Sequence, residues 1–200
     1  MIIWAFYRAF SQLPDWMSDL VIKPLVFAAP IFYYVVAIER LPLSSIGLSG
    51  AKFKRDLGIG LSFGLLFAVE GILSNSVKYG RISLIPLVSV GPIGTLAIII
   101  TALVASFAEE LLIRGFFYTR LRTAYQSELK AMLVSALMYF MLLVPTVFVI
   151  TRLSGMTLIV FVATNIVMSI ANTMIFNETK TLTVPVLIHV FWNLAVVMYL

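Results

Sequence analysis

The chain has 200 residues, of which 62% are hydrophobic and only 12% are charged, and its mean hydropathy is +1.07. This composition excludes an ordinary soluble domain and indicates a single polytopic membrane domain. The formal net charge is +5, but the 14 Lys and Arg residues are scattered between apolar blocks, so we expect no nucleic-acid partner.

Cysteine and histidine counts restrict the possible chemistry. The sequence contains no Cys, which excludes disulfides, thiolate nucleophiles and Cys-ligated metal centres. His189 is the single histidine, and there is no HExxH motif. Because a catalytic zinc ion usually takes two or three His ligands, we expect neither a metal nor another cofactor.

Residues 1–20 predict an amphipathic helix that lies in the membrane interface. Apolar and polar residues each recur with helical spacing, so that each group lies on its own face of the helix. The apolar face carries Ile3, Phe6, Tyr7, Phe10, Leu13 and Met17, and the polar face carries Arg8, Ser11, Gln12, Asp15 and Asp19. The segment lacks the basic start and small-residue cleavage site of a signal peptide.

Six apolar segments follow, and together they predict a single transmembrane domain over residues 21–200. Each is long enough to cross a hydrocarbon core about 30 Å thick. The expected spans are 21–38, 57–73, 93–113, 130–150, 156–176 and 183–200. We therefore expect an all-α membrane bundle of six transmembrane helices preceded by the interfacial helix.

The distribution of basic residues predicts the orientation of the bundle in a cell membrane. Nine Lys and Arg residues fall in the loops after spans one, three and five: Arg40, Lys52, Lys54, Arg55, Arg114, Arg120, Arg122, Lys130 and Lys180. Five fall on the other side: Arg8, Lys23, Lys78, Arg81 and Arg152. Since cytoplasmic loops carry the excess of positive charge, these three loops should be cytoplasmic and both termini outside.

A charged cluster lies at the end of the third span. Glu110 and Arg114 are four residues apart and share a helix face, whereas Glu109 points about 100° away. One carboxylate can therefore pair with Arg114 while the other is available for chemistry. A plain juxtamembrane charge cluster is the alternative interpretation.

A second polar pair opens the sixth span. His189 and Asn193 are also four residues apart, and in the expected topology they lie at the same membrane level as the two glutamates. We predict that the two clusters converge. Hydrogen bonding between helices is the alternative role for His189. For Asn172, near the inner end of the fifth span, a hydrogen bond to a neighbouring helix is the favoured role, and membership of the same polar layer is the alternative.

The sequence also contains residues that other classes of intramembrane protease use. Gly47-Leu48-Ser49-Gly50 matches the GxSG string of rhomboid serine proteases, but it falls in a polar loop where an ordinary turn is expected. Aspartyl intramembrane proteases need two Asp residues within spans, and Asp15, Asp19 and Asp56 lie outside the expected spans. Both classes are disfavoured.

The two clusters resemble the motifs of the CPBP (Abi) family of intramembrane proteases, which includes CAAX prenyl endopeptidases. The family motif EExxxR followed by Gly reads here as Glu109, Glu110, Arg114 and Gly115, and the motif HxxxN reads as His189 and Asn193. Pro185 before the histidine and the stretch from Ser45 to Leu48 are also similar. The resemblance covers about residues 43–195.

One family motif is incomplete. The family has FxxxH in the fourth core helix, but aligning Phe140 with the Phe puts Val144 at the histidine position, and aligning Tyr139 puts Leu143 there. For the other residues the resemblance implies Glu109 as general base, Glu110 and Arg114 as its positioning pair, and His189 and Asn193 as oxyanion donors.

The resulting hypothesis is a glutamate-dependent intramembrane endopeptidase acting on a membrane-associated peptide or protein. The main alternative is an inactive pseudoprotease of the same fold that binds a membrane partner or serves as a partner subunit. A small transporter subunit is a third possibility. The substrate, its prenylation and the oligomeric state stay open at this point.

Overall fold

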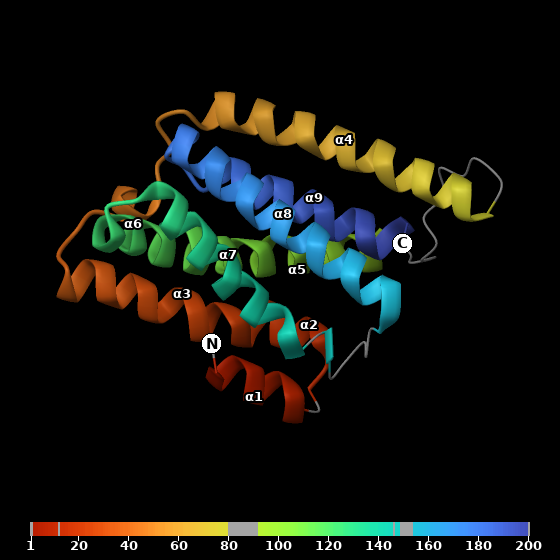
Figure 1. Ribbon diagram of the computed structural model, residues 1–200, viewed down its shortest axis with the longest axis horizontal. Helices are drawn as coiled ribbons and strands as arrows, with labels where there is room; N and C mark the ends of the chain where they lie inside the picture. The colour runs from red at the N-terminus through yellow and green to blue at the C-terminus, as the bar shows by residue number, and fades with distance from the viewer. Residues whose placement is uncertain (1, 12, 80–91, 146, 149–153, 200) are drawn as a thin grey trace.

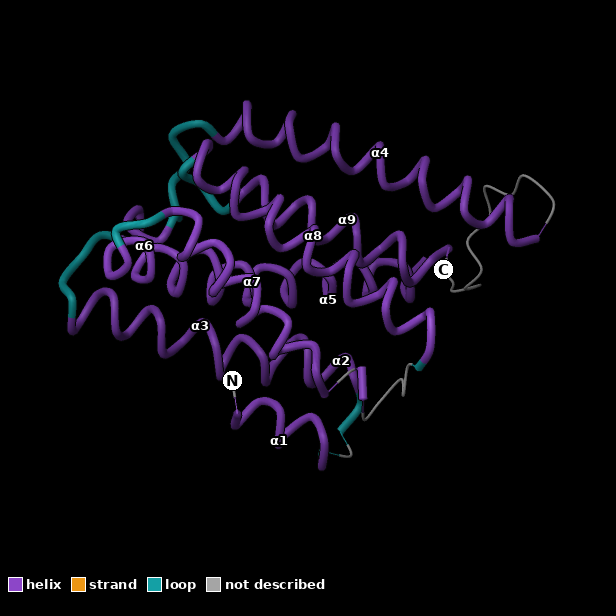
Figure 2. Tube along the Cα trace, in the orientation of Figure 1, coloured by secondary structure: helices purple, strands orange, loops and turns teal. Residues whose placement is uncertain are grey.

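A computed structural model describes residues 2–11, 13–79, 92–145, 147–148 and 154–199. Throughout these residues the regular structure is helical, and Figure 2 draws helices joined by short loops. The predicted all-α membrane bundle is therefore confirmed as a fold class.

The N-terminal segment forms a short helix and then a longer rod, rather than one helix over residues 1–20. Helix α1 (Ile2–Phe10) ends before Pro14, and α2 (Asp15–Met17), η1 (Ser18–Ile22), α3 (Lys23–Tyr33) and η2 (Tyr34–Ile38) then follow one another without a break. Pro14 cannot donate a backbone hydrogen bond and disfavours helical geometry in the residue before it, so the rod starts after it. Residues 15–20, which were expected to end the interfacial helix, are thus the start of the first long helix.

Helix α4 (Phe53–Tyr79) lies at one edge of the bundle and packs mainly against α9 (Thr183–Tyr199), as Figure 1 shows. Gly60 and Gly64 form a GxxxG pair on α4 that faces this neighbour. A Cβ at Gly60 would lie 2.4 Å from Leu187, and one at Gly64 would lie 2.4 Å from Phe191. The two glycines therefore allow these helices to approach closely, as small residues do in membrane helix pairs.

The centre of the bundle is a second long rod with an unusual middle. It consists of α5 (Pro92–Glu110), η4 (Leu111–Tyr118) and α6 (Thr119–Tyr125), and η4 is π-helical. The five-residue η1 is π-helical as well. Such wide turns inside α-helices are rare and are found frequently at functional sites. Here they flank Glu110 on one rod and Lys23 on the other.

Helices α7 (Glu128–Pro145) and α8 (Gly155–Thr179) complete the bundle, together with the short 3-10 helix η3 (Leu43–Ile46). A Cβ at Gly115 would lie 2.8 Å from the backbone carbonyl oxygen of Ile46. Since a backbone atom cannot be moved aside cheaply, only glycine at position 115 allows η3 to lie directly against η4.

Four helical segments among the described residues are long and apolar enough to cross a membrane: Ser18–Ile38, Gly94–Tyr125, Glu128–Pro145 and Leu158–Thr179. They correspond to the predicted first, third, fourth and fifth spans. The predicted second span lies in α4, which is not one of the four, and the sixth lies in α9, whose apolar part Thr183–Ala195 is shorter. The chain is an integral membrane protein, and the count of six spans stays a prediction.

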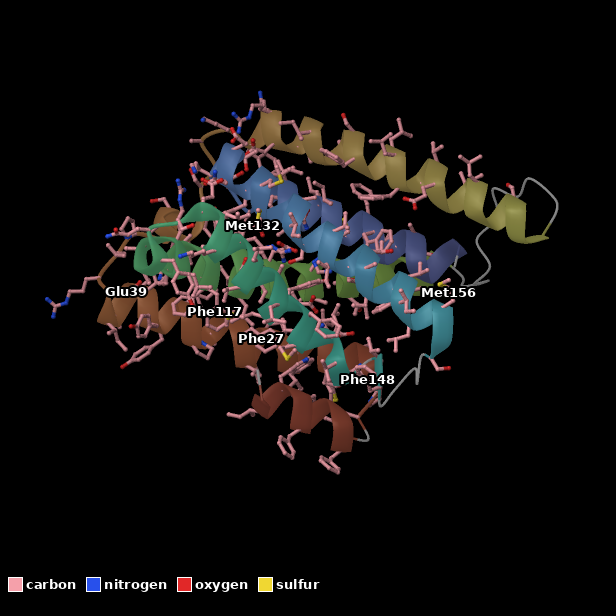
Figure 3. All side chains as sticks on the ribbon, viewed as in Figure 1. Phe27, Glu39, Phe117, Met132, Phe148 and Met156 are labelled. Atoms are coloured by element: carbon pink, nitrogen blue, oxygen red, sulfur yellow. The ribbon has the colours of Figure 1, made fainter. Side chains whose placement is uncertain are left out.

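The predicted cytoplasmic loops gather at one end of the bundle. Figure 1 shows the end of the first rod, the start of α4, α6 and the connection between α8 and α9 together at this end. In Figure 3, Glu39 lies at this end and Met156 at the opposite one. One of the nine basic residues assigned to these loops is misplaced: Arg114 lies in the helix η4, buried beside Glu110, and not in a loop.

Candidate active site

Glu110 is the centre of a buried polar cluster. Its side chain is fully buried, and its Oε1 atom accepts hydrogen bonds from Nη1 of Arg114 at 3.0 Å and Nδ2 of Asn172 at 3.3 Å. Nδ1 of His189 lies 2.8 Å from the same oxygen. The expected convergence of the third, fifth and sixth spans therefore takes place around this one carboxylate.

The guanidinium of Arg114 contacts three residues, Glu110, Ser169 and Tyr139. Besides its ion pair with Glu110, its Nη2 donates to the carbonyl oxygen of Ser169 at 3.0 Å and to Oγ of the same serine at 2.8 Å. Its guanidinium lies 5.0 Å from the ring centre of Tyr139. Because Arg114 is only 1% exposed, these contacts compensate for a charge that would otherwise be costly to bury.

His189 connects Glu110 with two further groups through its other ring nitrogen. Nε2 lies 3.2 Å from the hydroxyl of Tyr139 and 3.7 Å from Oε2 of Glu109. A neutral imidazole that donates from Nδ1 to Glu110 has Nε2 as an acceptor, whereas a protonated one donates from both nitrogens. Glu110 thus orients the imidazole so that Nε2 faces Glu109.

Glu109 points away from Glu110 and pairs with a residue from the first rod. Its Oε1 accepts a hydrogen bond from Nζ of Lys23 at 2.7 Å, and Asp19 lies 2.7 Å from the same nitrogen. Lys23 is only 7% exposed, and its ammonium lies 5.4 Å from the ring centre of Trp4. Of the two motif glutamates, Glu110 is therefore paired with Arg114 and Glu109 with Lys23.

The two glutamates differ in accessibility. The side chain of Glu109 is 13% exposed and that of Glu110 is 0% exposed. The space that Glu110 shares with Arg114, Tyr139, Asn172 and His189 does not admit a water-sized sphere. A water molecule or a substrate therefore reaches the carboxylate of Glu109 more easily than that of Glu110.

Asn193 lies one helical turn from His189 and has a different neighbour. Its Nδ2 donates to Oγ of Ser106 at 3.2 Å, and Ser106 is one turn before Glu110 on α5. Asn193 does not line the cavity around Glu110. It therefore extends the polar layer along the α5 and α9 interface rather than joining the carboxylates directly.

Ser49 of the GxSG string does not join this cluster. Its Oγ accepts the backbone N–H of Ala51, and Gly47 is in the left-handed conformation of a turn, with φ of +80°. The partners of His189 are the carboxylates and Tyr139 instead. The turn interpretation of this string agrees with the structure.

The site also contains residues that the sequence did not indicate. From the sequence, Tyr139 stands out only as an alignment partner of the family's Phe, and Lys23 only as a charge that indicates topology. Asp19 and Lys23 are four residues apart next to an apolar segment, and this spacing could have predicted their buried ion pair. Ser106 and Ser169 carried no distinguishing pattern.

Comparison with known proteins agrees with this geometry. The fold and the buried Glu-Arg-His cluster define an integral membrane helical protein with a polar site inside the bundle. Residues 91–195 match the family described as Type II CAAX prenyl endopeptidase Rce1-like. The chain belongs to this family, which confirms the resemblance to CAAX proteases.

The matched region contains both glutamates, Arg114, His189 and Asn193, whereas Lys23 and Asp19 lie outside it. Neither the curated proteins nor the solved structures that were compared contain a match. The ion pair to Glu109 is therefore contributed by a part of the chain that the family match does not cover.

Proposed function

We propose that this protein is a glutamate-dependent intramembrane endopeptidase that cleaves a membrane-associated peptide or protein. The observation that carries the proposal is the arrangement of Glu109 and His189. Oε2 of the partly exposed Glu109 side chain lies 3.7 Å from Nε2 of His189. The other ring nitrogen of His189 contacts Glu110, which is paired with Arg114. This is a general base beside an oriented hydrogen-bonding group.

In the proposed reaction, Oε2 of Glu109 takes a proton from a water molecule as the water oxygen attacks the scissile carbonyl carbon. The negative charge that develops on the carbonyl oxygen accepts a hydrogen bond from Nε2 of the protonated His189, while Asn193 stays hydrogen-bonded to Ser106 one turn away. Glu109 then gives its proton to the leaving nitrogen as the carbon–nitrogen bond breaks. Preorganised donors of this kind commonly supply a large part of the barrier reduction.

In this proposal Lys23 supports Glu109 in place of the histidine that the resemblance leads us to expect in the fourth core helix. The ammonium engages Oε1 of Glu109 through a charge-assisted hydrogen bond of 2.7 Å, which leaves Oε2 directed toward His189. Leu143 and Val144, the two positions aligned with that histidine, are half-buried apolar residues.

One observation favours the alternative of a pseudoprotease. Glu109 contacts the ammonium of Lys23, which neutralises its charge, and the inner cavity beside Glu110 excludes a water-sized sphere. A site closed in this way would bind a membrane partner without cutting it. The alternative predicts the opposite result in the experiment that follows.

The experiment compares the native chain with Glu109→Gln and Glu110→Gln in membranes, using a library of membrane-inserted and prenylated peptides. Native cleavage and a loss of at least about 100-fold in Glu109→Gln would support the peptidase. Gln is nearly isosteric with Glu, and Asp19 still pairs with Lys23, so the bundle should stay folded in Glu109→Gln. Glu110→Gln also removes the partner of buried Arg114, so its cleavage rate is compared only after its melting temperature is known.

The matched control is Glu70→Gln, which makes the same chemical change at an exposed glutamate of α4. Its cleavage rate should equal that of the native chain. If the native chain cleaves no peptide of the library, or if Glu109→Gln cleaves as fast as native, the peptidase proposal is wrong.

A further inference from the structure

A second cavity, of about 430 Å³, opens at the end of the bundle that carries the basic loops. It is lined by residues of η3, α6 and the end of α8, and it is separate from the cluster around Glu110. Its wall contains the buried rings of Tyr118 and Phe176, which meet edge to face with their centres 6.1 Å apart. Two aromatic rings thus form part of a lining that otherwise consists mostly of polar residues.

Two hydroxyl groups at this cavity have no hydrogen-bond partner among the described residues. They belong to Ser45 and Tyr118, and both oxygens are buried. Tyr118 is only 1% exposed, so its hydroxyl is a buried donor next to an open cavity. Buried polar groups are normally paired, and a ligand with acceptor oxygens would pair these two.

Two cationic side chains at the cavity, those of Arg122 and Lys180, donate hydrogen bonds to the same amide oxygen. Nη1 of Arg122 donates to Oδ1 of Asn177 at 2.7 Å, and Nζ of Lys180 donates to the same oxygen at 2.8 Å. Glu128 lies 3.7 Å from Arg122 and also accepts a hydrogen bond from Asn177. One carboxylate therefore faces two cations, which leaves a positive charge at the rim.

The cavity also lies at one end of a helix that is longer than the hydrocarbon core is thick. The helical segment Gly94–Tyr125 has 32 residues and is about 48 Å long, whereas the hydrocarbon core is about 30 Å thick. The helix is therefore longer than one crossing needs, and its last turns carry Arg120 and Arg122, charges that are favoured outside the hydrocarbon. Lys180 follows the last turn of α8 at the same end.

From these observations we propose that the cavity binds the phosphate-bearing headgroup of an anionic phospholipid. The phosphate oxygens accept from Arg122 and Lys180 at the rim and from the hydroxyls of Ser45 and Tyr118 inside. Basic pockets between membrane helices are suited to anionic headgroups. The proposal does not depend on whether the protein is a peptidase.

The test uses the full-length chain in mild detergent, titrated with short-chain phosphatidylglycerol, and measures the dissociation constant. Arg122→Gln and Lys180→Asn should each weaken binding about fivefold, and Tyr118→Phe should weaken it as well. Asn is chosen at position 180 because the backbone there has φ of +60°, a conformation that Asn tolerates well. Thermal melting of each variant shows whether it is folded.

The matched control is Arg40→Gln, which removes an exposed cation that follows Glu39 at the same end of the bundle. It should bind phosphatidylglycerol as the native chain does. Three results would overturn the proposal. The first is equal weakening by Arg40→Gln. The second is equally tight binding of zwitterionic phosphatidylcholine or inorganic phosphate. The third is displacement of the lipid by a peptide with a free C-terminal carboxylate but not by its amide.

Discussion

The ammonium of Lys23 lies 2.7 Å from Oε1 of Glu109, although 86 positions separate the two residues in the sequence. The contact joins the first helical rod to the motif EExxxR in the central rod. Lys23 is buried and shares its charge with Asp19 as well, so the three groups form one ionic cluster. A residue from outside the family-matched region thereby becomes part of the candidate site.

Replacing Lys23 by Met should lower peptide cleavage at least about tenfold, because the carboxylate of Glu109 loses the group that holds it in place. The substitution also leaves Asp19 and Glu109 without their shared cation, so the melting temperature in detergent should fall. Asp19→Asn keeps the contact between Lys23 and Glu109 and should retain cleavage within about threefold of native. Lower stability with unchanged cleavage would show that Lys23 has only a structural role.

A histidine in α7 should partly replace Lys23. Leu143 is one turn beyond Tyr139 and shares its face, which is turned toward His189 and Arg114. We therefore expect Leu143→His to restore part of the cleavage lost in Lys23→Met, and Val144→His, which points about 100° away, to restore less. Equal failure of both histidine variants would contradict the idea that lysine replaces the family's histidine.

Glu110 and Arg114 form a buried pair whose two halves should be strongly coupled. Arg114→Gln leaves the carboxylate of Glu110 without its cation in a fully buried position, so we expect a loss of about 3–5 kcal/mol in the free energy of unfolding. Glu110→Gln should cost a similar amount. The double variant should lose clearly less than the sum, and an additive result in chemical denaturation would refute the coupling.

The contact between α4 and α9 gives a prediction that is independent of the site. Gly64→Val places atoms where Phe191 now lies and should lower the melting temperature markedly, with a cost of at least about 1–3 kcal/mol. Gly58 lies on the same helix, and a Cβ there meets no atom within 4 Å. Gly58→Val therefore serves as the matched control, and equal destabilisation by both variants would argue against a close helix approach at Gly64.

Much of this architecture was predictable because membrane helices are signalled by long apolar segments and by the charges that interrupt them. Glu110, Arg114 and His189 were recognisable since each is costly at membrane depth, and their four-residue spacings fix which groups share a face. For Asn172 a hydrogen bond to a neighbouring helix was the favoured role, and the partner it donates to is Glu110 of the polar layer itself.

Other features depend on contacts between distant segments, which spacing alone does not encode. Lys23 reaches Glu109 only because the rod that starts after Pro14 runs beside α5. Asn193 has the expected spacing from His189. Its hydrogen-bond partner, however, depends on which residue of α5 lies opposite it, and that residue is Ser106. The roles of these residues in catalysis stay predictions.

The orientation in the membrane can be tested by single-cysteine labelling, since the native chain has no Cys. Lys54 and Arg122 are exposed and lie in the two loops predicted to be cytoplasmic, whereas Met156 is 73% exposed and lies at the opposite end of the bundle. An impermeant maleimide added to intact cells should modify Met156→Cys and leave Lys54→Cys and Arg122→Cys unmodified, because loops rich in Lys and Arg are retained in the cytoplasm. Permeabilising the cells should make all three react, which controls for accessibility of the thiols. Labelling of Lys54→Cys or Arg122→Cys in intact cells, with Met156→Cys protected, would invert the topology and place the basic end outside.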